Sequence, residues 1–282
     1  MPEPLLIAYG PDPIQAGDLY LPPGDQPVPV VVLLHGGNWA AVYDRVQLAG
    51  LANDLVRHGW AVWNVDYRSL GGGGGWTATF DDVATAVDAL AGLDDRLDLT
   101  RVTVVGHSAG GQLALWSAAR PLLPAEAPGS APVVAPVGAV SLGGVIDLVA
   151  ADAARYGASM ADPNPTPRPG GPRLAHPELS GAVAELAGEG VVAALLGGHS
   201  ADVPQRYTWM SPTSTVPTVP TLAVHGVDDD IVTADFSRAY HRAALAKGVP
   251  AELHEVRGDH FDVVHPGDPS WAAVLEWLDA LR

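Results

Sequence analysis

The feature that most constrains this chain is a glycine-rich turn, Gly-His-Ser-Ala-Gly-Gly, at residues 106–111. It follows residues 101–105, whose apolar pattern predicts a buried strand, and precedes residues 112–120, whose alanine-rich pattern predicts a helix. Glycines on both sides of Ser108 allow a sharp turn that would lift its hydroxyl above the carboxyl edge of a sheet. A purely structural turn has the same local composition, so the interpretation of Ser108 as a nucleophile depends on partners elsewhere in the chain.

The length and composition favour one large domain. The chain has 282 residues, of which 48% are hydrophobic, and single α/β domains reach this size. It has no cysteine, which excludes a disulfide, a thiolate zinc site and a cysteine nucleophile. The ten histidines are scattered, and His254, His260 and His265 lack the i, i+4 spacing of a helical zinc site. We therefore expect neither a metal nor another cofactor.

The charge balance disfavours anionic partners. The formal net charge is −17, from 15 Lys and Arg residues against 32 Asp and Glu, whereas a phosphate backbone requires a basic face. We interpret the acidity as favouring solubility rather than substrate steering. The N-terminus lacks the features of a signal peptide, and no later stretch is long enough to span a bilayer. We expect a soluble cytoplasmic protein that binds neither nucleic acid nor membrane, and the sequence indicates no oligomeric state.

The order of the predicted elements indicates a mostly parallel sheet. Strands are expected at residues 28–34, 60–67, 101–105, 137–142, 221–224 and 251–256, and helices at 48–58, 80–93, 112–120, 182–196, 234–247 and 271–281. Two short runs at residues 5–10 and 17–21 predict an antiparallel lead-in. This alternation is typical of a doubly wound α/β sheet with helices on both faces, and we expect residues 1–282 to form a single domain.

The alternation is interrupted after the sixth predicted strand. Residues 156–177 contain many prolines and glycines and show no clear period. We expect residues 150–212 to form a cap inserted above the carboxyl edge of the sheet. A disordered surface loop fits the Pro-rich part equally well.

A second glycine-rich turn, His-Gly-Gly-Asn-Trp at residues 35–39, follows the predicted strand at 28–34. Glycines let the backbone approach a ligand closely, so the N–H groups of Gly37 and Asn38 are candidates for an oxyanion hole. The N–H of Ala109, the residue after Ser108, is the third candidate. A tight turn that only requires glycine is the alternative, and the position upstream of the Ser108 turn favours the functional interpretation.

Candidates for an acid and a base follow the last two predicted strands. The segment His-Gly-Val-Asp-Asp-Asp spans residues 225–230, and Gly-Asp-His-Phe-Asp spans residues 258–262. Because ligands bind at the carboxyl ends of parallel strands, Ser108, Asp229 and His260 are expected to meet there as nucleophile, acid and base.

Neighbouring carboxylates leave the choice of acid ambiguous. Asp228 and Asp230 flank Asp229, and Asp147 follows the preceding strand. We prefer Asp229, which stands four residues after His225, because the resemblance given below implies an acid at this spacing, and we expect His225 to support the acid loop.

Two other residues near these motifs receive different interpretations. His107 is expected to pack beside the turn rather than to react. The only lysine, Lys247, lies in a predicted surface helix, so we set a Ser-Lys mechanism aside. Three tryptophans, Trp39, Trp76 and Trp209, are candidates for an aromatic substrate pocket, although core positions fit them equally well.

The four motifs together resemble the α/β-hydrolase superfamily. More narrowly, they resemble bacterial esterases grouped with feruloyl and acetylxylan esterases and with kynurenine formamidases. The likeness runs from about Tyr9 to the C-terminus, and the Pro-rich residues 156–177 are the departure from it. The resemblance implies acyl transfer to Ser108, with His260 as general base and Asp229 as the acid that orients it.

Three functions follow from this resemblance, in a definite order. We expect a carboxylesterase that cleaves a small ester with a short acyl group and a bulky or aromatic leaving group. An arylformamidase ranks second, because a charged substrate head needs a cation and this acidic chain offers little for that role beyond Arg68, Arg155 or Arg206. A non-hydrolytic binding or epimerising protein ranks third, since all three triad positions are filled.

Overall fold

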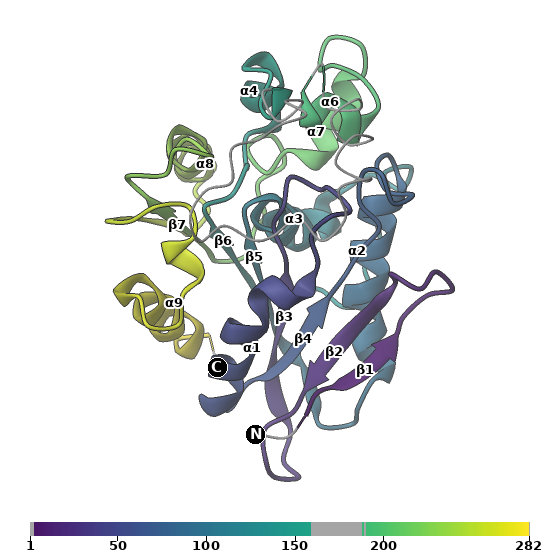
Figure 1. Ribbon diagram of the computed structural model, residues 1–282, viewed down its shortest axis with the longest axis vertical. Coiled ribbons are helices and arrows are strands. Elements are labelled where there is room, and N and C mark those ends of the chain that lie inside the picture. The colour runs from purple at the N-terminus through teal and green to yellow at the C-terminus, as the bar shows by residue number, and fades with distance from the viewer. Residues whose placement is uncertain (1–2, 159–187, 189, 282) are drawn as a thin grey trace.

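The computed structural model describes residues 3–158, 188 and 190–281 (Figure 1). Among these residues, eight strands form one sheet in the order β1-β2-β4-β3-β5-β6-β7-β8. The strands are β1 (Leu5–Ala8), β2 (Ala16–Tyr20), β3 (Val28–Leu34), β4 (Ala61–Val65), β5 (Leu97–His107), β6 (Gly138–Leu142), β7 (Thr221–Gly226) and β8 (Ala251–Val256). The β1–β2 and β2–β4 pairs are antiparallel and all other pairs are parallel, which confirms the predicted sheet and its lead-in.

Helices cover both faces of this sheet (Figure 1). The helices α1 (Ala49–Arg57) and α9 (Pro269–Asp279) pack on one face, and α2 (Ala78–Ala89), α3 (Ala109–Ala119) and α8 (Asp235–Ala246) pack on the other. Short 3-10 helices lie at Arg45–Leu48, Leu90–Gly92, Arg120–Leu122 and Asp262–Val264. Within the described part of the chain, every helix falls short of the length and apolar character that a membrane crossing requires.

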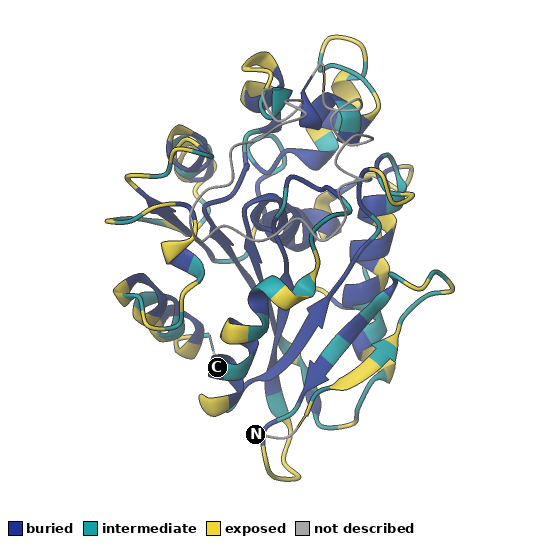
Figure 2. Cartoon of the chain, viewed as in Figure 1, coloured by how far each residue is buried: buried dark blue, intermediate teal, exposed yellow. Residues whose placement is uncertain are grey.

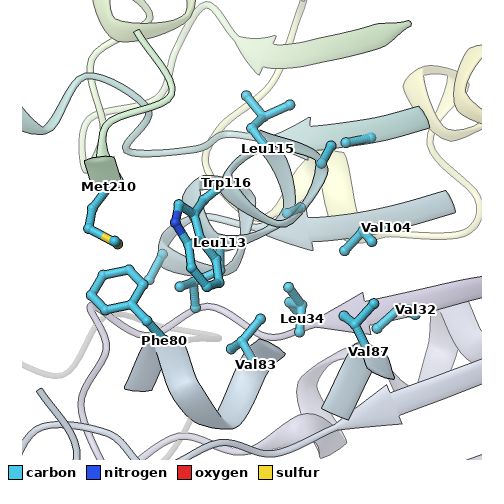
Figure 3. Packing of buried hydrophobic residues seen from close by; sticks show 14 of the residues in the cluster. Val32, Leu34, Phe80, Val83, Val87, Val104, Leu113, Leu115, Trp116 and Met210 are labelled. Carbon is cyan, nitrogen blue, oxygen red and sulfur yellow. The ribbon is translucent and has the colours of Figure 1, made fainter. Parts of the chain in front are cut away.

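The central strands are buried on both faces (Figure 2). In β3, Val31 and Leu33 join the apolar cluster under α1 and α9, whereas Val32 and Leu34 join the larger cluster under α2 and α3. Figure 3 shows this larger cluster, in which Leu34 lies close to side chains of both helices. The two-residue period of a strand therefore explains why an unbroken run of β-branched residues builds two cores.

The bounds of the two elements that flank Ser108 differ from the predicted ones. The sequence predicts a strand at residues 101–105 and a helix from residue 112, whereas β5 begins at Leu97 and α3 begins at Ala109. Low intrinsic helix propensity at Gly110 and Gly111 hides the true start of α3, and tertiary packing overrides it. As a result, Ser108 stands directly between the last residue of β5 and the first residue of α3.

The segment between β6 and β7 contains α4 (Leu148–Ala153), α6 (Val191–Leu196) and α7 (Pro204–Met210). Both α6 and α7 pack against α4. The predicted helix at 182–196 ends where α6 ends, but α6 begins only at Val191, because Gly190 has a φ of 113° that a helix does not allow. Residues 182–187 and 189, like most of the Pro-rich residues 156–177, lie outside the described residues. The sequence did not predict α4 or α7, each of which is only about two turns long. The role of residues 150–212 as a cap stays a prediction.

Candidate active site

Ser108 has a backbone conformation that residues with side chains rarely adopt. Its φ is 53° and its ψ is −118°, and strain of this kind is typical of functional turns. The backbone N–H of Ser108 donates to the carbonyl of Leu142, the last residue of β6, at 2.8 Å. Because α3 begins at the next residue, unpaired N–H groups and the positive end of the helix dipole lie beside the serine.

The glycines of this turn permit a close approach between backbones. A Cβ atom on Gly106 would lie 1.9 Å from the carbonyl oxygen of Gly110, and one on Gly110 would lie 2.0 Å from the carbonyl oxygen of Leu34. Both obstacles are backbone atoms, which cannot rotate aside. The first turn of α3 can therefore pack against the ends of β5 and β3 only because these positions lack side chains.

His260 and Asp229 form a buried hydrogen-bonded pair. The Nδ1 atom of His260 lies 2.7 Å from Oδ2 of Asp229, and the two side chains are 4% and 1% exposed. A carboxylate only accepts hydrogen bonds, so the proton of the neutral imidazole resides on Nδ1 and leaves Nε2 with a free lone pair. This is the tautomer that a general base requires.

Asp229 is held by further hydrogen bonds from its own loop. Its Oδ1 accepts from the backbone N–H of Ile231 at 2.9 Å and of Val232 at 2.8 Å. Its Oδ2 also lies 3.3 Å from Nε2 of the fully buried His225. Burial alone would raise the pKa of the Asp229 carboxyl, but hydrogen bonds from His225 and His260 outweigh burial and hold this pKa below its ordinary value. The carboxylate therefore stays charged and fixed in orientation.

His225 supports this loop, as the sequence predicts. Its Nδ1 lies 2.7 Å from Oγ of Ser237, and its Nε2 lies 2.9 Å from the carbonyl of Val232. The carbonyl can only accept, so Nε2 carries the proton and Nδ1 accepts from the serine hydroxyl. His225 therefore ties the acid loop to α8.

Contacts of His260 with His107 and with the residue after β6 place the His260–Asp229 pair next to the Ser108 turn. The Nε2 atom of His107 lies 2.9 Å from the backbone carbonyl of His260, and the two imidazole rings are 4.6 Å apart. On the other side, a Cβ atom on Gly143, which follows β6, would lie 3.2 Å from Nδ1 of His260. No described residue forms a hydrogen bond with the Ser108 hydroxyl, so a proton transfer from Ser108 to His260 belongs to the mechanism proposed below.

His107 packs beside the turn, as the sequence predicts. It is buried, and burial together with the neighbouring His260 lowers the pKa of His107 to about 3. A neutral His107 donates its Nε2 proton to the carbonyl of His260 and adds no second positive charge beside the candidate base.

The loop after β3 lies directly against Ser108. A Cβ atom on Gly36 would lie 3.0 Å from Cβ of Ser108. The next three residues, Gly37, Asn38 and Trp39, have φ angles of 108°, 54° and 53°. Among the described residues, no acceptor takes the N–H of Gly37 or Ala109, so both groups are available to an oxygen atom bound beside Ser108.

Buried polar side chains hold this loop in place. The hydroxyl of Tyr67 donates to the carbonyl of His35 at 2.8 Å, and the two rings stack with centroids 4.4 Å apart. Farther along, Nε1 of Trp39 donates to Oε1 of Gln112 in α3 at 3.3 Å. The amide of Gln112 donates in turn to the carbonyl of Met210 at 2.9 Å. The sequence analysis missed Tyr67 and Gln112, because nothing in their local sequence distinguishes them from ordinary core residues.

The three candidate tryptophans occupy different environments. Trp39 is fully buried in the larger core cluster, so of its two interpretations the structure favours the core position over the substrate pocket. Trp76 is half-buried, contacts Phe80 edge to face, and lies under the guanidinium of Arg206 at 4.8 Å from the ring centre. Trp209 is half-buried and packs against the larger cluster. None of the ring contacts among the described residues joins two of these tryptophans, and a role in substrate binding for Trp76 and Trp209 stays a prediction.

The three other candidates for the catalytic acid either have another structural role or are exposed to solvent. Oδ1 of Asp147 accepts from the N–H of Ala150 at 3.0 Å and caps the N-terminus of α4. Asp228 and Asp230 are both exposed. Among the four candidate acids, only Asp229 has a hydrogen bond from His260 within the described residues.

A cavity of about 380 Å³ lies beside the acid loop. Its lining includes the carboxyl-terminal end of the α4 segment, the acid loop and the start of α8, with Tyr156, Asp229, Ile231 and Phe236 among the residues. It is open to solvent, and its lining includes Asp229 but neither Ser108 nor His260. The cavity shares Asp229 with the His260–Asp229 pair.

Solved structures with the same architecture cover nearly the whole chain. A carbohydrate esterase from gut microbiota aligns with a TM-score of 0.75 at 18% identity, over 98% of this chain and 94% of the esterase. Esterase B from Lactobacillus rhamnosis aligns with a TM-score of 0.74 at 22% identity, over 98% and 85% of the two chains. The chain has the α/β-hydrolase fold. Esterase 2 from Thermogutta terrifontis, solved with butyrate bound, has the same α/β-hydrolase architecture, with a TM-score of 0.69 at 18% identity over 99% of this chain and 93% of the esterase.

Sequence comparisons agree with this α/β-hydrolase fold over part of the chain. Residues 17–127, from β2 through α3, match the BD-FAE family model. Esterase LipC from Mycobacterium tuberculosis is 30% identical over 113 residues, which make up 38% of this chain and 27% of that esterase. These findings confirm the predicted resemblance to α/β-hydrolase esterases.

Proposed function

We propose that this protein is a carboxylesterase that uses Ser108 as nucleophile, His260 as general base and Asp229 as the orienting acid. The observation that carries the proposal is the 2.7 Å contact between His260 and Asp229 beside the strained Ser108 turn. The similarity to esterases over residues 17–127 supports the reaction class, and the α/β-hydrolase fold is compatible with it.

The proposed acylation step moves one proton through His260. The Ser108 oxygen attacks the ester carbonyl carbon while its proton passes to Nε2 of His260, and Asp229 stabilises the imidazolium that forms. The carbonyl oxygen becomes an oxyanion that accepts hydrogen bonds from the backbone N–H groups of Ala109, Gly37 and Asn38. Collapse of this intermediate breaks the bond to the leaving alcohol, which takes the proton from His260.

Deacylation repeats these steps with water in place of the serine. His260 accepts a proton from water as the water oxygen attacks the acyl carbon, and the same N–H groups hold the second oxyanion. The bond to Ser108 then breaks, the serine regains its proton from His260, and the carboxylic acid leaves. No redox partner is needed, because the net reaction adds one water across the ester bond.

The charges around the site support a neutral ester as substrate. Arg68, one of the three candidate cations, donates from Nε and Nη2 to the buried carboxylate of Asp82 at 2.8 and 2.6 Å. Arg206 donates to the carbonyl of Leu196 at 2.7 Å and covers the face of Trp76. A substrate carboxylate would have to compete with these partners, so we rank a small-ester carboxylesterase above an arylformamidase.

The mechanism places the leaving group on the side of Ser108 where the cavity beside Asp229 lies. His260 must protonate the leaving oxygen, so the alcohol part of the ester lies on the His260 side of Ser108. The cavity lined by Tyr156, Ile231 and Phe236 is on the acid side of the same sheet edge. We propose that this cavity receives a bulky or aromatic leaving group.

Covalent labelling tests the proposed function directly. Purified protein is incubated with a fluorophosphonate probe, digested and analysed by mass spectrometry. We expect one labelled peptide with the modification on Ser108, accompanied by loss of 4-nitrophenyl acetate hydrolysis. Absence of labelling in protein that shows a folded circular dichroism spectrum would refute a serine hydrolase mechanism and favour a binding protein.

A further inference from the structure

The loop that carries two proposed oxyanion donors has an unusual backbone. Gly37 tolerates its φ of 108°, but Asn38 and Trp39 adopt φ angles of 54° and 53° with side chains present. Two consecutive residues with side chains in this region are strained, and such strain persists only where neighbours enforce it. The position of the N–H groups of Gly37 and Asn38 therefore depends on what holds this loop.

Two hydrogen bonds to other parts of the chain hold the backbone conformation of Trp39. Its indole N–H donates to Gln112, and its carbonyl accepts from the N–H of Leu70 at 2.6 Å. These contacts hold the far end of the loop. They leave open how the Asn38 side chain is fixed.

Asn38 is held by a tyrosine from a distant part of the chain. The hydroxyl of Tyr156 donates to Oδ1 of Asn38 at 2.8 Å across a sequence separation of 118 residues. Asn38 is only 7% exposed, so this bond lies away from competing water. The hydrogen bond connects the loop after β3 to the segment that follows α4.

Tyr156 is itself a rigid support. Its backbone N–H donates to the carbonyl of Ala151 at 2.9 Å, and its carbonyl accepts from the N–H of Val191 at 3.0 Å. Its ring contacts Phe236 edge to face, with centroids 6.4 Å apart. Burial, with Asp229 nearby, raises the pKa of the Tyr156 hydroxyl, so the group stays a protonated donor at neutral pH.

We propose that Tyr156 is a positioning residue for the oxyanion hole, acting through its hydrogen bond to Asn38. This role rests on the proposed function, because it needs the N–H groups of Gly37 and Asn38 to bind the oxyanion. With the bond in place, the strained loop is fixed before substrate arrives, and no reorganisation is needed as negative charge develops. This role belongs to the Tyr156 hydroxyl, which is bound to Asn38, and not to the ring that lines the cavity beside Asp229.

Removal of the Tyr156 hydroxyl oxygen by substitution tests this proposal. Tyr156→Phe keeps the ring against Phe236 and removes only the hydroxyl that donates to Asn38. We expect kcat for 4-nitrophenyl acetate to fall by about 5- to 50-fold with KM changed less than about threefold, because a loosened donor weakens the transition state more than the bound ester. Tyr240→Phe is the matched control, since its buried hydroxyl donates to Oγ1 of Thr221 at 3.0 Å and its kcat should stay at the wild-type level.

A double-mutant cycle separates positioning from a general structural effect. In the background of Asn38→Ala, the partner of the Tyr156 hydroxyl is gone, so adding Tyr156→Phe should change kcat by less than about twofold. Additive losses in the cycle, or a Tyr156→Phe protein with wild-type kcat, would overturn the role of Tyr156. A circular dichroism spectrum shows whether Tyr156→Phe is folded. If it is not, Asn38→Ala removes the same hydrogen bond at its acceptor, and wild-type kcat in that variant would overturn the proposal.

Failure of the proposed function gives a different result. Wild-type protein that neither hydrolyses 4-nitrophenyl acetate nor reacts with a fluorophosphonate would refute the esterase, and with it this role of Tyr156. An active wild-type enzyme with an unaffected Tyr156→Phe variant would refute the positioning role alone.

Discussion

His225 and His260 approach the same carboxylate oxygen, Oδ2 of Asp229, at 3.3 and 2.7 Å. The Nε2 proton of His225 is directed to the carbonyl of Val232, and its Nδ1 is held by Ser237 of α8, whereas Nδ1 of His260 donates to Oδ2 of Asp229. The orientation of His260 therefore depends on the fixed position of the acid loop, which His225 ties to α8. Asp229 therefore occupies the position from which a catalytic acid would control the base.

We predict that Asp229→Asn lowers kcat for 4-nitrophenyl acetate by about 10³- to 10⁴-fold. The amide can present its N–H₂ group to His260 and stabilise the wrong tautomer, which removes the free lone pair on Nε2. Steady-state kinetics on folded protein measures the effect. Asp228→Asn and Asp230→Asn, both at exposed positions, should stay within a few-fold of wild type.

Asp147→Asn distinguishes the second candidate acid. Asparagine caps a helix about as well as aspartate, so this variant should keep both its stability and its kcat. If Asp147→Asn is inactive while Asp229→Asn is active, the acid resides after β6 and our assignment is wrong.

Removal of the nucleophile should abolish turnover without unfolding the protein. Ser108→Ala takes away an oxygen that no described residue hydrogen-bonds, so we expect a change in unfolding free energy below about 1 kcal/mol. Hydrolysis of 4-nitrophenyl acetate should fall by about 10³-fold or more, because the remaining electrostatics do little without the hydroxyl. Urea unfolding and initial rates measure the two effects, and full activity in the folded variant would contradict the serine mechanism.

Stability should fall as the pH drops below neutrality, in part because of His107. Its pKa is lowered to about 3 in the folded protein, against about 6.5 in an unfolded chain, so the unfolded state binds the extra proton between these values. The free energy of unfolding then rises with pH across this window, by at most about 1.4 kcal/mol per pH unit for one group. His107→Gln keeps a donor for the His260 carbonyl and removes the titration.

Urea unfolding at pH 5, 6, 7 and 8 measures this dependence. Wild type should lose stability from pH 6 to pH 5, and His107→Gln should lose less. Asp229 does not interfere, because its lowered pKa makes its contribution fall only below about pH 4. An equal slope in both proteins would show that His107 is not the titrating group, and buried His35, whose pKa is also lowered, would be the next candidate.

The fold could be predicted from the sequence because its signals are local. The β-branched run of β3 predicts both bounds of the strand, and the predicted bounds of β8 also match, although that strand has only one β-branched residue. The sequence predicts that the candidate triad residues lie near one another because they follow β5, β7 and β8, whose carboxyl ends lie at one edge of the sheet. In contrast, the bond between Tyr156 and Asn38 joins segments 118 residues apart, and no periodicity reports such a contact. The local sequence of a tryptophan after a glycine turn is the same whether its side chain faces a ligand or the core. The burial of Trp39 could therefore be determined only from the structure.

The steric role of the turn glycines gives a further prediction. Gly110→Ala would place Cβ 2.0 Å from the carbonyl oxygen of Leu34, which neither backbone can avoid. We expect a loss of about 3 kcal/mol or more in unfolding free energy, or protein that does not fold. Gly92→Ala is the matched control, because a Cβ there meets nothing within 4 Å. Its stability should change by less than about 1 kcal/mol and in the favourable direction, since alanine restricts the unfolded chain.

The last prediction concerns substrate choice. We expect kcat/KM to be highest for aryl acetates, lower for long-chain aryl esters and lowest for N-formylkynurenine, all measured in one buffer. The formyl amide carries a charged amino acid head, and the chain has a net charge of −17 with Arg68 already paired to Asp82. Arg206→Met is the control for a hidden carboxylate site, because Arg206 contacts the half-buried Trp76 and forms no ion pair within the described part of the chain. It should leave kcat/KM for aryl acetates within about twofold, and a selective loss for N-formylkynurenine, or a tenfold preference of wild type for that amide, would reverse the ranking.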